Sequence, residues 1–446
     1  MKKLLQGTFG IVKIGLGILL LLSVLLWLLV DLNPFKSSLV GLIHAKTGWS
    51  VTIPKRLQLT FFPNLGLQLE QLSVKNTESF SEQLFAEFGN VDLSIKWLPL
   101  FSGQIELDTL YLDGLSLYLS RNKQGQANWE DVLRSNDDTD TKPLTQKIMG
   151  ILGAFEGEGI QLEHGYLRYE DQLTGRILEL KEVNVHIARL QLGQTIPVTL
   201  AFILHQNSPE LTQSVQIHFD VEFNVSKNMA QIKPFQLSSD TPSRPQLKTR
   251  LTIANLEYQL DKHFLVISGV HLVNAPLNVY SELQGQVQQE NFALQGSIKL
   301  PEFNLKQWLS EWSIALPELQ DKATLTRFSA ESKLTITQDS VQLAPIAMMI
   351  DQTALKGSLR LNHFNDPHLN FNILADKVVL ENYLTPKSNQ VPTDSVLTPE
   401  SLSKQIGALS QPLAFLKNFQ SDGQLKIQQM SLNDVSIQDF VVELHE

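Results

Sequence analysis

The sequence contains no cysteine in its 446 residues. This absence excludes disulfide frameworks, thiol catalysis and thiolate metal sites together. It leaves the redox compartment open, because proteins of oxidising and of reducing compartments can both lack cysteine.

Positive charge is scarce: 36 Lys and Arg residues stand against 46 Asp and Glu, and the net charge is -10. Binding to nucleic acid needs clustered basic residues that neutralise phosphates, so we exclude nucleic acid as a partner. Charged residues make up 18% of the chain and hydrophobic residues 43%, a composition that favours an ordered protein.

Motifs of the common enzyme classes are also missing. The sequence has no GxGxxG, no P-loop, no HExxH and no GxSxG. The nearest pair of histidines, His363 and His368, lacks the spacing of a zinc site, and the paired carboxylates Glu170 and Asp171 fit a hairpin turn. We therefore expect no enzymatic activity, no metal and no cofactor.

A long hydrophobic run occurs only near the N-terminus. The 17 residues from Ile14 to Val30 carry no charge, and Leu20 and Trp27 lie within them. Extended back to Phe9 across Lys13, the run would reach roughly 33 Å as a helix, enough to span a bilayer. The sequence therefore predicts a membrane anchor that includes Ile14, Leu20, Trp27 and Val30.

A cleavable signal peptide is the competing interpretation of this run. A signal peptide has a shorter apolar core and small residues at its cleavage site, whereas Asp31, Asn33 and Pro34 follow here. Lysines precede the run, so the positive-inside rule places the N-terminus in the cytoplasm and the rest of the chain beyond the inner membrane.

Apolar residues alternate with polar ones over much of the chain, the pattern of strands with one dry face. Between Thr47 and Leu119 the alternation occurs in short runs broken by Pro, Gly and Asn, which indicates a meander of antiparallel strands. The longest run extends from Val215 to Val225 without a slip. A small helix is predicted within residues 301–309, where Leu305, Trp308 and Leu309 share a face.

Several blocks resemble the AsmA family of Gram-negative envelope proteins: TGWSVTIPKRLQL, FFPNLGLQLEQLSVKN and the segment from VDLSIKWLPL to NWEDVL, and later LPEFNLKQWL and LNFNILADKVVLENYLTP. The resemblance covers residues 37–134, 157–187 and 300–386. It implies an inner-membrane-anchored periplasmic protein tied to outer-membrane biogenesis, with a groove-shaped sheet similar to chorein-type lipid transfer proteins. Relatives in this family usually continue with further strands, so the chain is either naturally short or a fragment.

The dry face of such a sheet needs a covering layer. Helical patterns are too scarce to supply it, so the sheet either closes into a sandwich or forms a trough that holds acyl chains. The resemblance favours the trough. The predicted fold is mainly β with few helices: a transmembrane helix followed by an elongated, twisted antiparallel β-groove. Its lipid-facing residues would be Leu57, Leu59, Phe61, Leu93, Ile95, Leu107, Leu115, Leu117, Val215, Ile217, Phe219, Val221, Phe223, Val225, Phe371 and Ile373.

The predicted organisation follows composition. It comprises a cytoplasmic tip and anchor (1–33), a chorein-like meander with a short helix (34–134), an acidic loop and helix (135–156), the central groove (157–385), a Ser- and Pro-rich linker with a short helix (386–420), and C-terminal strands (421–446). Apolar positions in 421–446 repeat those of 103–117 at an offset of 320, which predicts one structural unit used twice.

Together with the resemblance, these patterns predict a protein that binds and moves phospholipid, with the inner membrane as one partner and an outer-membrane or periplasmic protein at the distal end as another. An outer-membrane protein assembly factor, acting through exposed sheet edges without lipid transfer, is the alternative. A structural tether would bind neither lipid nor client.

Overall fold

The computed structural model describes residues 50–129, 159–383 and 420–445, and residues 36–37, 40–41, 44, 80 and 99. Within these ranges, the residues not described are 56, 61–64, 77–79, 81–83, 97–98, 100–106, 190–192, 209, 225, 245–246, 289–290, 315, 317, 365 and 433–434. The predicted anchor, Phe61, Val225, the acidic loop 135–156 and the linker up to residue 419 lie outside the described residues.

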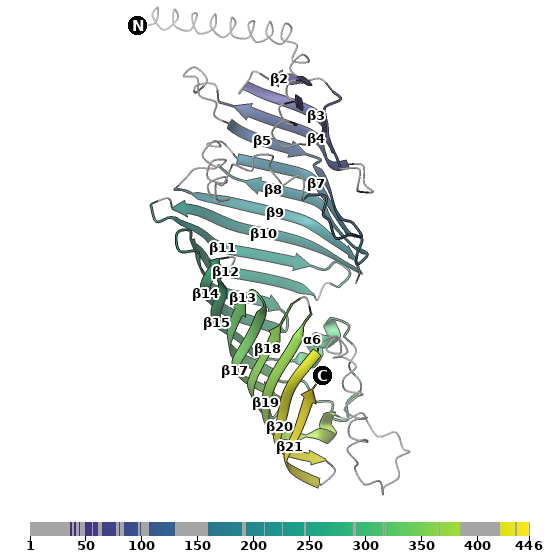
Figure 1. The fold of residues 1–446 in the computed structure, drawn as a ribbon, viewed down its shortest axis with the longest axis vertical. Coiled ribbons are helices and arrows are strands. Elements are labelled where there is room, and N and C mark those ends of the chain that lie inside the picture. Colours follow the sequence, from purple (N-terminus) through teal and green to yellow (C-terminus); the bar gives the residue numbers. More distant parts are fainter. Residues whose placement is uncertain are drawn as a thin grey trace, which may run out of the picture. The chain divides into compact units, whose positions relative to one another are not determined.

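The chain divides into two compact units, Met1–Gln216 and Ile217–Glu446, and the division falls within one strand, β10. Each unit is a sheet (Figure 1). The first unit contains β1 (Val51–Thr52), β2 (Gln58–Thr60), β3 (Leu65–Lys75), β4 (Leu84–Ile95), β5 (Leu107–Asp113), β6 (Ser116–Arg121), β7 (Gly159–Asp171), β8 (Arg176–Ile187), β9 (Thr195–Asn207) and the start of β10 (Glu210–Asn224).

The second unit continues with β11 (Met229–Asp240), β12 (Lys248–Gln259), β13 (Phe264–Asn274), β14 (Leu277–Gln288), β15 (Asn291–Phe303), α6 (Leu305–Glu311), β16 (Phe328–Thr337), β17 (Ser340–Ile350), β18 (Thr353–Asn362), β19 (His368–Val379), η1 (Leu380–Tyr383), β20 (Gln420–Leu432) and β21 (Val435–His445). The strands from β11 to β19 form an antiparallel meander in chain order. The mainly-β prediction is confirmed, and so is the small helix near residue 305.

The prediction of an antiparallel sheet is wrong at two places. β7 runs parallel to β5 and β6, and β20 runs parallel to β19. A parallel neighbour requires a crossover of about a dozen residues or more. The stretches from Arg121 to Gly159 and from Val379 to Gln420 provide these connections. Both are segments that the sequence marks as loop and linker, so their length explains the change of direction.

β5 and β6 together occupy one position in the sheet, between the same two neighbouring strands. Both pair with β4 on one side and with β7 on the other, with a bend at Gly114, whose φ is +65°. β20 and β21 instead fold back on each other as a hairpin, in which Leu432 pairs with Val435. The two segments that match at an offset of 320 residues therefore differ in structure: the first is a bent strand and the second is a hairpin.

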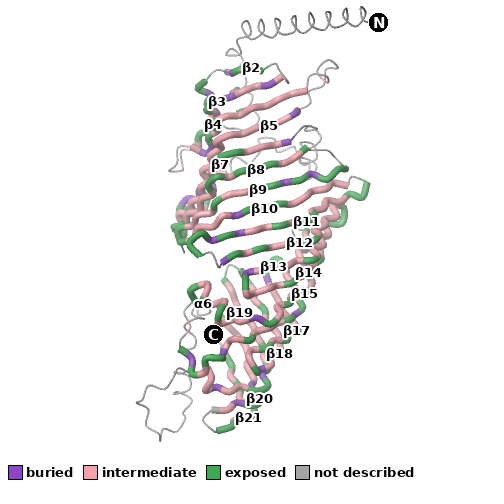
Figure 2. Tube along the Cα trace, turned by 180° about the vertical axis from the view of Figure 1, so that it is seen from behind, coloured by how far each residue is buried: buried purple, intermediate pink, exposed green. Residues whose placement is uncertain are grey.

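Some of the buried hydrophobic residues form two clusters. The first includes Val51, Ile53, Leu69, Val74 and Phe85 at the first strands of the first unit, and Val40, in a stretch with helical residues, packs against it. The second joins Ala375, Leu380, Ile427 and Met430 at the last strands of the second unit. The strands between carry mostly half-buried residues (Figure 2). Among the described residues, no helix is long and apolar enough to cross a membrane.

Candidate functional site

The registers of the second unit place apolar residues opposite one another across every strand pair. Residues that face each other in neighbouring strands point to the same side of the sheet. One row therefore crosses the sheet from β11 to β21 on one side: Ile232, Leu256, Ile267, Leu283, Gly296, Leu334, Leu343, Leu359, Phe371, Gly423 and Leu444.

A second row on the same side is nearly as apolar. It contains Phe235, Ile253, Val270, Ser281, Ile298, Ser332, Ile346, Gly357, Ile373, Leu425 and Val442. We call the surface formed by these two rows the apolar face.

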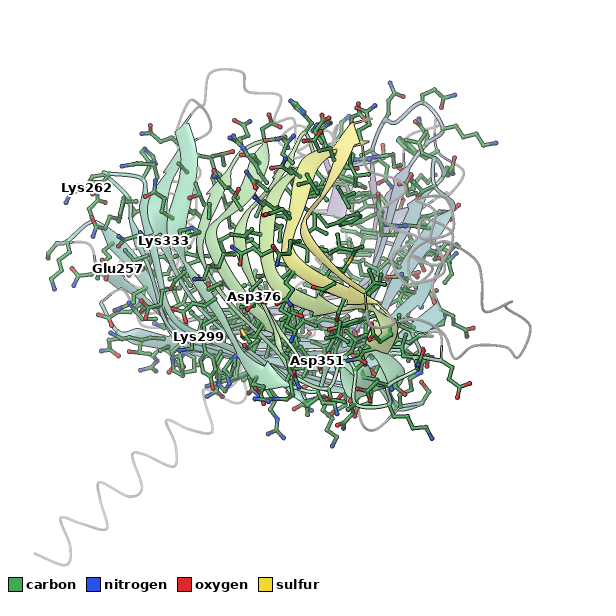
Figure 3. The ribbon with its side chains drawn as sticks, turned by 90° about the horizontal axis from the view of Figure 1, so that it is seen from below. Glu257, Lys262, Lys299, Lys333, Asp351 and Asp376 are labelled. Carbon is green, nitrogen blue, oxygen red and sulfur yellow. The ribbon has the colours of Figure 1, made fainter. Side chains whose placement is uncertain are left out.

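The opposite side of the same strands is polar. The row next to the first comprises Gln231, Glu257, Val266, Gln284, Gln295, Thr335, Gln342, Arg360, Asn370 and Asp422. Charged groups of this side include Glu257, Lys299, Lys333 and Asp376, which are labelled in Figure 3. The sheet of the second unit thus has one apolar and one polar surface.

The apolar face is incompletely buried. Leu256, Ile267, Leu334, Leu343 and Leu359 are each half-buried, although a residue in the core of a closed sandwich would be buried. Among the described strands, the most extensive contacts are those between hydrogen-bonded neighbours. The described part of the chain therefore leaves apolar side chains within reach of a guest.

The first unit repeats the arrangement. One row contains Leu67, Leu93, Leu110, Ile160, Ile187 and Val198, in which each residue pairs with the next. Positive φ angles at the non-glycine residues His164 and Glu182 lie at breaks in register. These bulges restore the apolar alternation after each break.

Most of the residues predicted to face lipid are half-buried: Leu93, Ile95, Leu107, Leu115, Leu117, Ile217, Phe219, Val221, Phe223, Phe371 and Ile373. Phe371 and Ile373 lie on the apolar face of the second unit, and the ring of Phe219 stacks on Phe235 of that face at 5.9 Å. Leu57 and Val215 are buried, at 8% and 6% exposure, and Leu57 belongs to the first core cluster.

One end of the second sheet carries an insertion that sequence patterns reveal only in part. Residues 304–327, which we call the rim insertion, connect β15 to β16 and contain α6. Asn304 caps α6, because its side chain accepts a hydrogen bond from the backbone N–H of Gln307 at 2.9 Å. The backbone N–H of Lys306 donates to the carbonyl of Leu325 at 2.8 Å and closes the neck of the insertion.

Two tryptophans anchor α6 to β13. The indole N–H groups of Trp308 and Trp312 both donate to Oδ1 of Asn274, at 2.8 and 2.9 Å. Asn274 is 3% exposed, and its amide donates to Oγ1 of Thr249 at 2.8 Å. Asn274 pairs with Leu277 next to the apolar face, so α6 lies against one end of that face.

A single carboxylate anchors the other end of the insertion. Asp351, in the turn between β17 and β18, accepts hydrogen bonds from the backbone N–H groups of Leu325, Thr326 and Arg327 at 2.8, 3.1 and 3.2 Å. The hydroxyl of Tyr383 donates to the same carboxylate at 3.2 Å. Burial and then the charge of Asp351 raise the pKa of Tyr383 to about 12, so this hydroxyl remains a donor at physiological pH.

We expect Asp351→Ala to loosen the rim insertion, because three backbone N–H groups would lose their acceptor at about 1–3 kcal/mol for each one left buried. Hydrogen exchange should accelerate at Leu325, Thr326 and Arg327 and remain unchanged in β12. Tyr383→Phe, which removes one donor and leaves the carboxylate in place, is the matched control. Equal exchange in the two variants would contradict this role of Asp351.

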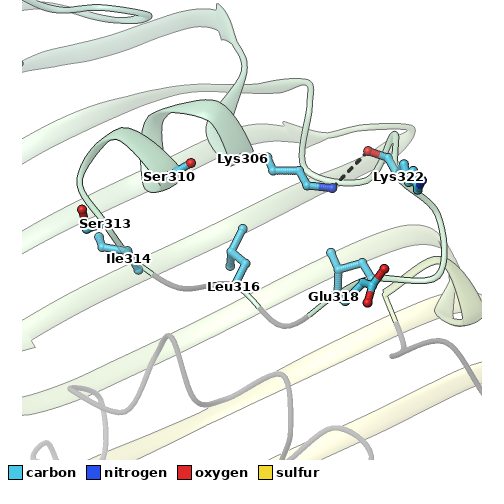
Figure 4. A pocket seen from close by; sticks show the side chains of 8 residues that line it. Lys306, Ser310, Ser313, Ile314, Leu316, Glu318 and Lys322 are labelled. Atoms are coloured by element: carbon cyan, nitrogen blue, oxygen red, sulfur yellow. Dashed lines mark hydrogen bonds between the residues drawn. The ribbon is translucent and has the colours of Figure 1, made fainter. Parts of the chain in front are cut away.

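Between α6 and the returning chain lies an open hollow of about 600 Å³ (Figure 4). It is lined by Lys306, Ser310, Ser313, Ile314, Leu316, Glu318, Leu319 and Lys322. Nζ of Lys306 donates to the carbonyl of Lys322 at 3.1 Å across one side of the hollow. Among the described residues, no group of three or more His, Asp or Glu side chains could hold a metal ion.

Comparison with known proteins gives one result at the level of a family. The model of the AsmA family matches residues 1–446, the whole chain. No individual curated protein matches significantly. The chain therefore belongs to the AsmA family.

Proposed function

We propose that this protein binds phospholipid on its apolar face and helps to move it, in support of outer-membrane biogenesis. The observation that carries the proposal is the uninterrupted apolar row from β11 to β21, whose members are half-buried except for the exposed Leu444, and which is backed by a polar surface. An acyl chain laid on this row would exchange water for side chains at about 0.8 kcal/mol per methylene group. This mechanism is passive and requires neither catalysis nor a cofactor.

The proposal includes an arrangement in the cell. The N-terminal run anchors the chain in the inner membrane, and the residues after Asp31 lie in the periplasm. The lysines before the run and the acidic residue after it support this orientation. Protease added to spheroplasts should digest the protein from its C-terminal side, and protection there would contradict the orientation.

Mass spectrometry of lipids that copurify with the full-length chain tests the binding. We expect phospholipid at a defined ratio to protein, above that of an unrelated single-span membrane protein extracted in the same detergent. A ratio no higher than in this control would contradict lipid binding.

An assembly factor that acts through protein contacts is the second candidate. It is favoured by exposed apolar side chains of β21: Val435 and Val441 are 50% and 43% exposed. Charged substitutions at these two positions, which lie outside the two rows of the apolar face, should then abolish outer-membrane protein assembly without changing the lipid ratio. If the lipid ratio decreases in these variants, the result favours lipid binding over the assembly-factor proposal.

A further inference from the structure

The rim insertion is far longer than the other turns of the second unit that the structure describes. Ala275 and Pro276 alone connect β13 to β14, and Asp351 and Gln352 alone connect β17 to β18. Long connections within a compact domain are uncommon, and an ordered one is often a functional element. This one is held at its neck and at both ends by the contacts of Lys306, Asn274 and Asp351.

The two sides of α6 have different surroundings. Successive helical residues are separated by about 100°, so residues two apart point in nearly opposite directions. Trp308 and Trp312 point to Asn274 at the end of the apolar face, whereas Lys306 and Ser310 line the hollow. Trp308 and Trp312 therefore hold α6 at the end of the apolar face, and Lys306 and Ser310 of the same helix line the hollow.

The lining of the hollow combines charged, hydroxyl and apolar side chains. Lys306 and Lys322 carry ammonium groups, Glu318 carries a carboxylate, and Ser310 and Ser313 carry hydroxyls. Ile314, Leu316 and Leu319 add apolar surface, and Ile314 is 37% exposed. Because Lys306 uses one of its three donors on the carbonyl of Lys322, two remain for a ligand.

We propose that this hollow binds the phosphoethanolamine headgroup of a phospholipid, with its phosphate at Lys306 and Lys322 and its ammonium at Glu318. The inference rests on the proposed function, since a lipid whose chains lie on the apolar face must keep its charged headgroup paired or hydrated at the end of that face. The hollow lies at that end.

The charges of the hollow also predict selectivity. A purely anionic headgroup such as phosphatidylglycerol would meet repulsion from Glu318. A choline headgroup has no N–H to donate to the carboxylate, whereas a primary ammonium has three. The expected order of affinity is therefore ethanolamine, then choline, then glycerol.

The full-length chain in detergent can be titrated with dihexanoyl lipids that differ only in headgroup. We expect the ethanolamine lipid to bind about tenfold more tightly than the glycerol lipid. Glu318→Gln should remove this preference, and Lys322→Gln should weaken both lipids several-fold. Lys333→Gln, an exposed lysine on the polar side of β16, is the matched control and should change neither affinity.

Three outcomes would overturn the headgroup site. Equal affinities for all headgroups, or variants that bind like the wild type, would contradict it while chain binding and the proposed function persist. Equally tight, Lys322-dependent binding of inorganic phosphate would indicate a site for free phosphate instead. If the wild type binds no dihexanoyl lipid and copurifies with none, the proposed function itself fails.

Discussion

Replacement of Leu283 by Asp should remove most of the copurifying lipid and leave the protein folded. Leu283 lies in the middle of the apolar row, between Ile267 of β13 and Gly296 of β15, and is half-buried. A carboxylate there would repel acyl chains, because an ion in contact with hydrocarbon loses hydration that nothing replaces. In the lipid-free protein the same carboxylate can still reach water, so only a moderate decrease in melting temperature is expected.

Gln284→Asp is the matched control for this experiment. Gln284 is the next residue along β14 and points to the polar side, where its neighbours are Val266 and Gln295. The same charge one residue away should leave the lipid ratio and the melting temperature unchanged. We expect roughly tenfold less lipid with Leu283→Asp, a difference of about 1.4 kcal/mol. Complete unfolding of that variant would instead favour a closed core, and an unchanged lipid ratio would remove this row from the binding surface.

Replacement of Gly296 by Ala should destabilise the second unit severely. A Cβ atom at Gly296 would lie 1.7 Å from the carbonyl oxygen of Glu282, a backbone atom that cannot move without shifting β14. Gly357 is similar, because its Cβ would lie 1.9 Å from the carbonyl of Asn372. Glycine within a strand often marks a bend or a close backbone approach, which these contacts show directly.

The expected loss for Gly296→Ala is on the order of 3 kcal/mol or more, the range of substitutions that force backbone strain. Gln295→Ala, one residue earlier on the polar side, should change stability by less than about 1 kcal/mol. Chemical denaturation of the two variants beside the wild type gives the comparison. Similar midpoints for both would show that the sheet adapts to a side chain at this position.

The dry face of each strand could be predicted from sequence because alternation has a period of two, as in Val215 to Val225. Strand partners could not be predicted in this way. Whether β20 joins β19 in parallel depends on a crossover, and the alternating pattern of a strand is the same in either direction. The repeat at an offset of 320 illustrates the limit, since similar apolar spacing forms a bent strand in one place and a hairpin in the other.

The rim insertion was predictable only in part. Trp308 and Leu305 share a helical face, which indicates the helix. Asn274 and Asp351 give no such signal, because each acts on residues more than twenty positions away and neither belongs to a motif. The hollow beside α6 depends on the same long-range contacts, so Lys306, Glu318 and Lys322 could not be recognised as neighbours from their spacing.

The parallel pairing of β20 with β19 has a consequence for the order of folding. The strands from β11 to β19 pair with their successors in the chain, so each hairpin can form after closure of a connection no longer than the rim insertion. The last hairpin must first close a connection of roughly 40 residues, and the entropy lost in closing a loop rises with its length. We infer that β20 and β21 dock last, onto a meander that is already formed. Ala375 of β19 thus acquires its partner Ile427 at the end of folding and completes the second core cluster.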